Sequence, residues 1–209
     1  MTPSGEERRS MKAGLVKRAF AEAAKKIIIE EGIESVSVRR VADQAGYTFA
    51  TLYNHFKSED ALLWYTRNIM IGDIAAYMGA PKEEEVTGVK EVQKLFSRYL
   101  DYFIAYPNVF RFFYFHRLKR SEKPENCDTN IPGGDQAAKA FEFLAASGGY
   151  TPDEVGTMIQ TMIFCAHGLL TLSISDNDNL GLREVHSRMD EVIRFLLRDL
   201  SEKKNGEKI

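Results

Sequence analysis

Hydrophobic residues recur along this 209-residue chain at intervals of three and four, the spacing of amphipathic helices, and no stretch alternates as a strand would. The first part of the chain is predicted to form four helices, around 16–27, from about 37 to 45, after residue 48, and over 58–77. Gly32 and Gly46 end the first two. Thr48 and Ser58 are suited to cap the other two, because a hydroxyl oxygen accepts hydrogen bonds from first-turn N–H groups.

The rest of the chain is predicted to be helical as well. The expected helices are an amphipathic one over 89–103, an aromatic one after Pro107, one over 135–147, an almost wholly apolar one over 151–174 and a last one over 185–200. Thr151 carries a strong start signal, with Pro152 at the first helical position and Glu154 three residues after the cap. The stretches 119–134 and 201–209 are expected to be a loop and a frayed tail. An all-α protein of about nine helices results.

Composition is that of a soluble globular protein, with 44% hydrophobic and 28% charged residues. No apolar run approaches the ~20 residues needed to cross a bilayer, and the first fifteen residues lack the apolar centre of a secretory signal. Cys127 and Cys165 fit no CxxC pattern, so free thiols in a reducing compartment are the simplest interpretation. These features predict a cytoplasmic protein.

Charge is unevenly distributed within a net charge of -2. Residues 1–60 hold ten Lys/Arg and nine Asp/Glu, whereas residues 61–209 hold eighteen and twenty-one. The basic residues of the first part gather at its start and around residues 39–57: Arg8, Arg9, Lys12, Lys17, Arg18, Arg39, Arg40 and Lys57. A solvated face produces the same asymmetry, so charge alone does not establish nucleic-acid binding.

The stretch "QAGYTFATLYNHF" (44–56) has the form of a helix-turn-helix, two short helices joined by a turn that contains a glycine. Leu52 and Phe56 are predicted to face inward. Helical geometry then turns outward Phe49, Ala50, Tyr53 and Asn54. A helical corner in a core explains the inward residues, and a recognition helix in a DNA groove explains the outward rings as well. The pattern by itself is consistent with both.

The longer stretch "VSVRRVADQAGYTFATLYNHFKSEDALL" resembles the DNA-binding region of the TetR family of transcriptional regulators. The matching positions are Ser37, Val41-Ala42, Ala45-Gly46, Thr48, Leu52 to Phe56 and Ser58 to Asp60. The resemblance covers about residues 15–65. It implies a three-helix DNA-binding domain at 1–57, with 1–12 as a flexible arm. A linking helix then leads into a larger helical ligand-binding and dimerisation domain at 58–209.

The resemblance also implies which residues touch DNA. Ser37 and Thr48 would donate to phosphates from helix N-termini, and Lys57 would meet a third phosphate. Tyr53 and His55 would bind the DNA backbone or stack near it, which sets register rather than sequence. The base edges would be contacted by Arg39, Phe49, Ala50, Thr51 and Asn54.

Two positions depart from the family pattern. Many relatives have Lys-Gly where this chain has Phe49-Ala50, so a phosphate contact is lost and Phe49 is free to pack on a thymine methyl group. Arg40 stands where relatives are often acidic, which adds positive charge near the DNA. We therefore expect an operator different from those of the lysine-bearing relatives. Arg8, Arg9 and Lys12 either reach the minor groove or belong to a solubilising tail.

Residues 58–209 match the family less closely, through "YPNVFRFFYF" and "AHGLLTL". The resemblance implies a homodimer formed by helices 151–175 and 184–200; the alternative is that both helices are buried within one chain. It also implies a pocket for a hydrophobic ligand; the alternative is that the aromatic stripe is plain core. The candidate pocket residues are Tyr99, Phe103, Phe110, Phe113, Tyr114, Met158, Met162, Phe164 and His167. His116 and His167 either orient a ligand or are structural.

We therefore predict a DNA-binding regulator, a repressor that binds a palindromic operator as a dimer. A small hydrophobic or aromatic ligand would release it, with helix 58–77 transmitting the change. No enzyme activity, metal or cofactor is predicted. The segment "DNDNLG" lacks the glutamate of a calcium loop, the four histidines have no zinc spacing, and GxSxG is missing. The alternative is a helical small-molecule binding protein or enzyme whose helix-turn-helix is architectural.

Overall fold

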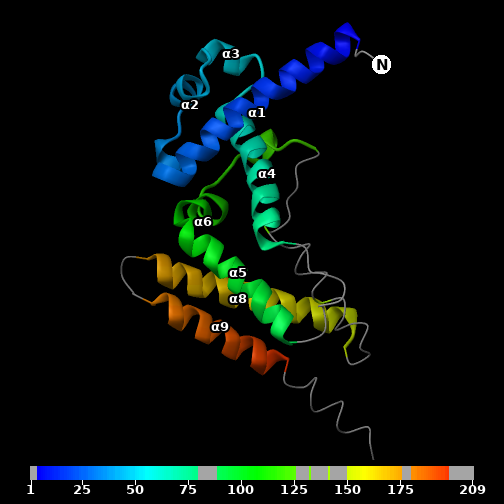
Figure 1. The fold of residues 1–209 in the computed structure, drawn as a ribbon, viewed down its shortest axis with the longest axis vertical. Coiled ribbons are helices and arrows are strands. Elements are labelled where there is room, and N and C mark those ends of the chain that lie inside the picture. Colours follow the sequence, from blue (N-terminus) through cyan, green and yellow to red (C-terminus); the bar gives the residue numbers. More distant parts are fainter. Residues whose placement is uncertain are drawn as a thin grey trace, which may run out of the picture. The chain divides into compact units, whose positions relative to one another are not determined.

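The computed structural model describes residues 4–79, 89–125, 150–175 and 180–197, together with Pro132 and Phe141. In these residues all regular structure is helical (Figure 1). It consists of eight α-helices and two short 3-10 turns. The predicted all-α class is therefore confirmed. The helix expected over 135–147, the tail at 201–209 and Cys127 lie outside the described residues.

The chain divides into two compact units, Met1–Asp73 with Tyr106–Thr129, and Ile74–Ala105 with Asn130–Ile209. The division differs from a single cut after residue 57, because α6 (Pro107–Tyr114) packs against α1 (Gly5–Glu31) in the first unit. Asn108 fastens this contact by donating from Nδ2 to the carbonyl of Ile29 at 3.2 Å. The long helix α4 (Glu59–Met78) carries the chain from the first unit into the second.

In the first unit α1 is the support for the helix-turn-helix. α2 (Val38–Ala45) packs on α1, and α3 (Phe49–Tyr53) packs on α2. The 3-10 turn η1 (Ile33–Ser35) connects α1 to α2. The side chains that fill the space between these helices are buried and apolar: Phe20, Ala24, Ile27, Val41, Ala42, Leu52, Phe56 and Leu62. Phe20 and Leu52, both 0% exposed, lie in this core.

Residues 1–12 were expected to form a flexible arm, and here the structure differs. α1 already begins at Gly5, so Arg8, Arg9 and Lys12 are helical. The reason is a capping box: Ser4 Oγ accepts from the N–H of Glu7 at 3.2 Å, and Glu7 Oε2 accepts from the N–H of Ser4 at 2.6 Å. These pairs satisfy two N–H groups at the helix start without any buried apolar residue.

The turn between α2 and α3 depends on Gly46, whose φ of 75° and ψ of 28° lie in the left-handed region. The N–H of Tyr47 reaches back to the carbonyl of Ala42 at 3.0 Å, which closes the helix end as a Schellman motif. A Cβ added at Gly46 would meet no atom within 4 Å. Backbone conformation, not space, is therefore what requires glycine here.

The second unit contains α5 (Val89–Ala105), α8 (Pro152–Ile174) and α9 (Leu182–Leu196), which pack against one another (Figure 1). The start signal at Thr151 is confirmed. Its Oγ1 accepts from the N–H of Glu154 at 3.3 Å, and Glu154 Oε2 accepts from the N–H of Thr151 at 2.8 Å. In its most apolar stretch α8 has a mean hydropathy of 1.4, yet only 28% of that stretch is buried in the single chain.

We expect Gly46→Ala to lower the free energy of unfolding by about 1 kcal/mol, because L-residues are disfavoured at positive φ. Gly14→Ala is the matched control. Gly14 lies inside α1, also with no atom within 4 Å of an added Cβ, and alanine should raise stability there by up to about 1 kcal/mol. Urea titration measures the change in the free energy of unfolding for both variants, and the two changes should have opposite signs. Equal shifts in the two variants would contradict the turn assignment.

Candidate functional site

The short helix α3 has one buried side and one exposed side. Leu52 is 0% exposed and Phe56, just beyond the helix, is 5% exposed. On the other side Phe49 and Tyr53 are 55% and 51% exposed, and their rings meet edge to face with centroids 6.5 Å apart. Ala50 and Asn54 are exposed as well. The predicted division into inward and outward residues is therefore confirmed, and two large rings stand in water without a partner element over them in the described chain.

Hydroxyl side chains hold the starts of both helices. Ser37 Oγ accepts from the N–H of Arg40 at 3.3 Å at the start of α2. Thr48 Oγ1 accepts from the N–H of Thr51 at 3.2 Å and lies 2.9 Å from Thr51 Oγ1 at the start of α3. Both caps are exposed. The same hydroxyl groups that fix the helix starts are thus presented to solvent, where they can donate to an anion.

Two further polar rings of the segment pack against α1. The Tyr47 ring packs on Phe20 with centroids 5.2 Å apart and is 39% exposed. The His55 ring lies 6.4 Å from Phe20 and is half-buried. These contacts tie the turn before α3 and the loop after it to the same buried residue. The position of α3 is therefore fixed from both ends.

The basic residues around the helix-turn-helix are partly paired. Arg39 is exposed. Arg40 forms an ion pair with Glu31 and donates to the carbonyl of Ser35 at 3.2 Å, so its charge is offset locally rather than simply added to the surface. Lys57 Nζ lies 3.2 Å from Glu122 Oε2. Sequence reasoning missed Glu122, which is 65 positions away from Lys57 and has no local signal.

The ten predicted DNA-contacting residues fall in one segment, Ser37 to Lys57, of the first unit. Eight of them are exposed: Ser37, Arg39, Thr48, Phe49, Ala50, Tyr53, Asn54 and Lys57. Thr51 and His55 are half-buried. The segment thus offers hydroxyl groups, an amide, a guanidinium, an ammonium and two rings to solvent, the donor and apolar groups that a DNA groove accommodates.

The nine predicted pocket residues are divided between the two units. Phe110, Phe113 and Tyr114 lie on α6 of the first unit. The second unit holds the rest, on α5 and α8: Tyr99, Phe103, Met158, Met162, Phe164 and His167. Of these, Phe164 is 69% exposed, so its ring faces out of the single chain.

Tyr99 and His167 form a polar pair inside the second unit. The Tyr99 hydroxyl lies 2.7 Å from His167 Nε2, and the two rings stack with centroids 6.0 Å apart. Phe103 packs edge to face on Tyr99 at 4.9 Å. Burial lowers the pKa of His167 to about 4, so the pair is uncharged at neutral pH. It offers hydrogen bonding to a neutral polar group in apolar surroundings.

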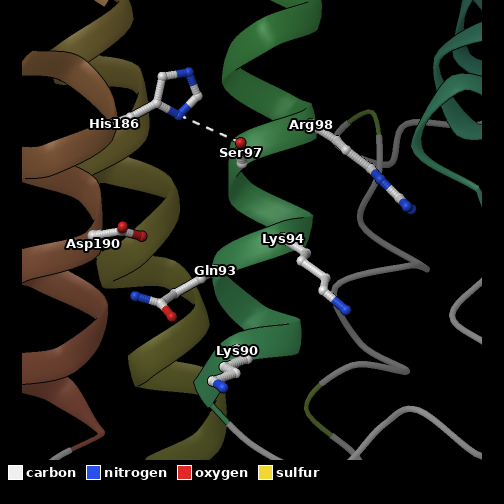
Figure 2. A pocket seen from close by; sticks show the side chains of 7 residues that line it. All are labelled: Lys90, Gln93, Lys94, Ser97, Arg98, His186 and Asp190. Carbon is white, nitrogen blue, oxygen red and sulfur yellow. Dashed lines mark hydrogen bonds between the residues drawn. The ribbon is translucent and has the colours of Figure 1, made fainter. Parts of the chain in front are cut away.

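A groove of about 630 Å³ is lined by residues of α5 and α9 (Figure 2). Its lining is polar and includes three basic side chains: Lys90, Lys94 and Arg98, with Gln93, Ser97, His186 and Asp190. The ring of His186 is held from both sides, with Nε2 2.9 Å from Asp101 Oδ1 and Nδ1 3.4 Å from Ser97 Oγ. None of the nine predicted pocket residues lines this groove. Across the described ranges, no group of three or more His, Cys, Asp or Glu is placed to hold a metal ion.

A capped, outward-facing helix after a glycine turn, on an all-helical chain, forms a helix-turn-helix, and comparison with known proteins agrees. Residues 21–64 match the model of the "Bacterial regulatory proteins, tetR family". A helix-turn-helix-type transcriptional regulator of Staphylococcus aureus strain USA300 is 39% identical over 49 residues, 23% of this chain and 26% of that protein. The chain thus matches about a quarter of the length of this curated relative.

Solved structures with the same fold are more distant in sequence. A tetR-family regulator from Streptomyces coelicolor has a TM-score of 0.64 and 15% identity, covering 89% of this chain and 84% of that one. RolR with resorcinol has a TM-score of 0.64 and 12% identity, covering 89% of each. A TetR variant from Acinetobacter baumannii with minocycline has a TM-score of 0.62 and 20% identity, covering 87% and 96%. Residues 21–64 therefore match the DNA-binding domain of the TetR family of transcriptional regulators, and the rest of the chain shares the fold of these solved structures.

The lowered pKa of His167 predicts a pH dependence of stability. In the unfolded chain this histidine binds a proton below about 6.5, whereas in the folded chain it does so only below about 4. The folded state therefore loses stability relative to the unfolded state as pH falls from 6.5 to 4, and no further below that. Urea unfolding across this range, compared with His167→Gln, should show a smaller loss in the variant. Identical pH profiles would contradict a neutral, buried His167.

Proposed function

We propose that this protein is a sequence-specific DNA-binding regulator that binds a palindromic operator as a homodimer. In this proposal residues 1–57 contact DNA, and residues 58–209 dimerise and bind an effector. The observation that carries it is the exposure of Phe49 and Tyr53, 55% and 51%, on a helix whose opposite side is buried. A helix-turn-helix that only supports the fold gains no stability from two large rings exposed to water. A recognition helix instead places such groups against base edges and sugars.

The proposed contacts follow from the chemistry of each exposed group. Ser37, Thr48 and Lys57 bind phosphates, and Tyr53 and His55 bind or stack beside the DNA backbone, which sets the register. The base edges are read by Arg39, Phe49, Ala50, Thr51 and Asn54. Arg and Asn are the side chains suited to guanine and adenine, and the Phe49 ring suits a thymine methyl group.

The proposed dimer is supported by an apolar surface on α8 and α9. Phe164 and Leu172 of α8 are 69% and 43% exposed, and Phe195 of α9 is 69% exposed. The exposed side of α8 around Phe164 also carries small or polar residues at helical spacing, namely Thr157, Gln160, Gly168 and Thr171. Burying this surface against a second copy explains why α8 is so apolar yet so little covered. Two-fold symmetry would then present two copies of α3 to two half-sites.

We further propose that the regulator is a repressor released by a small hydrophobic or aromatic ligand. Two proteins of similar fold were solved with small molecules, resorcinol and minocycline. In this chain the rings of α5 and α8 supply apolar surface, and the neutral Tyr99–His167 pair supplies a hydrogen-bonding group. The ligand must bind the DNA-incompetent state more tightly, and α4 is the proposed transmitter, because it continues from the first unit into the second.

The proposed site of action is the cytoplasm, where a bacterial operator is found. α8 alone among the described helices is long and apolar enough to cross a membrane by length and composition. A helix that is buried between two copies of a chain has the same composition. The capping box at Thr151 and the exposed Thr and Gln residues along α8 favour this explanation.

The first test is selection of binding sites from random duplex DNA at near-physiological salt. We expect one palindrome to be enriched, and Tyr53→Ala to weaken its binding about tenfold or more, because a ring and a backbone contact are both lost. Tyr77→Ala is the matched control, since Tyr77 is also 51% exposed but lies on α4 outside the helix-turn-helix. Failure of the wild-type dimer to enrich any sequence, with or without candidate effectors, would favour the architectural alternative.

The dimer is tested separately. We expect Phe164→Glu to convert the protein to a monomer at micromolar concentration, because each copy would bring a charge into an apolar interface. Sedimentation velocity measures the change, and operator affinity should fall with it. Phe115→Glu is the control, because Phe115 is 63% exposed on the first unit and should leave the dimer intact. An unchanged sedimentation coefficient for Phe164→Glu would refute the α8 interface.

A further inference from the structure

The segment that follows α6 returns to the start of α4 and is fastened there through Lys119. The N–H of Lys119 donates to Asp60 Oδ1 at 3.1 Å, and its carbonyl accepts from Trp64 Nε1 at 3.0 Å. Asp60 and Trp64 are one helical turn apart on α4, so they hold the Lys119 backbone from both sides. Lys119 Nζ adds a 3.5 Å contact to Asp60. The 3-10 turn η2 (Arg120–Glu122) then begins from a fixed point.

This turn places the Glu122 carboxylate at the N-terminus of α4. Its Oε2 accepts from Ser58 Oγ at 3.2 Å and lies 3.2 Å from Lys57 Nζ. Ser58 is also the cap of α4, since its Oγ accepts from the N–H of Ala61 at 3.1 Å. The Glu122 side chain is 22% exposed and that of Lys57 is 70% exposed. A carboxylate that is held in place by Ser58 is thus paired with a solvent-exposed ammonium group.

We propose that Glu122 is an internal competitor of the DNA phosphate for Lys57. This inference rests on the proposed DNA-binding function, in which Lys57 contacts a phosphate. A carboxylate and a phosphate oxygen both pair with the same Nζ, and the two anions repel one another across the short distance involved. Because the Lys57 side chain is exposed, its pair with Glu122 is weak enough for a phosphate to displace. Glu122 therefore lowers affinity without preventing binding.

Glu122 should act equally on all DNA sequences, because phosphate contacts carry no base information. Its removal should strengthen binding to the operator and to unrelated duplex by the same factor. The specificity ratio should stay constant. The salt dependence of DNA binding should change as well, since a Lys57 without its carboxylate partner displaces one more counterion from the DNA. A residue that merely supports the fold would affect stability and leave the salt dependence unchanged.

The test is Glu122→Gln, which removes the charge but keeps an oxygen that can accept from Ser58. We expect affinity for operator and non-operator duplex to rise roughly fivefold, the scale of one exposed charge pair. The slope of log K against log salt should become steeper by up to about 0.9. Fluorescence anisotropy at several salt concentrations measures both. Glu125→Gln is the matched control, because Glu125 is exposed and three residues further along, and the same loss of charge there should have little effect.

Two measurements exclude indirect effects. Trp64 is the sole tryptophan and donates to Lys119, so its emission reports whether the segment remains in place, and it should be unchanged in Glu122→Gln. In a Lys57→Met background the gain from Glu122→Gln should disappear, because the two residues act as a pair. An equal gain in that background would overturn the proposal, as would no gain, or a loss, in the single variant. Wild-type protein that binds no duplex at all would overturn the DNA-binding function itself, and this inference with it.

Discussion

The helix-turn-helix depends on the burial of Phe20 in α1. α3 is only five residues long, far below the length at which a helix is stable alone, so its existence depends on what it packs against. Leu52 anchors its middle in the core around Phe20, while the rings of Tyr47 and His55 contact Phe20 from the preceding turn and the following loop. The rigidity that a recognition helix needs is therefore supplied by a residue in a different helix, about thirty positions earlier. Phe49 and Tyr53 remain exposed because this core already holds α3 without them.

Features that depend on neighbouring residues were predictable from the sequence. Thr48, Ser58 and Thr151 cap their helices as expected, because a cap is an interaction over three residues. The inward position of Leu52 follows from periodicity in the same way. The start of α1 shows two local rules in conflict. Ser4 and Glu7 have the spacing of a capping box, but residues 5–10 include no large apolar side chain, so hydrophobic periodicity alone placed the helix start too late.

Features that join distant parts of the chain were not predictable. Tyr99 and His167 are 68 positions apart, and Ser58 and Glu122 are 64 apart, with nothing in either neighbourhood to indicate the partner. The aromatic stripe that suggested a single pocket is shared between the two units, because α5 belongs to one and α6 to the other. Helical spacing identifies which side of a helix is apolar. It does not identify which other helix covers that side.

The charges around the helix-turn-helix bear on the strength and the selectivity of the proposed DNA binding. Arg40 is offset by Glu31, Lys57 is paired with Glu122, and Phe49 stands where many relatives have lysine. In the proposed DNA complex, each feature would reduce the sequence-independent attraction to phosphates, in keeping with the nearly even charge balance of residues 1–60. In the proposed DNA complex, affinity then rests more on the groups assigned to base reading, namely Arg39, Asn54 and the Phe49 ring. Weak non-specific binding leaves more of the protein free to occupy its operator, because competing genomic sites hold less of it. A regulator built in this way gains selectivity by lowering its general affinity for DNA.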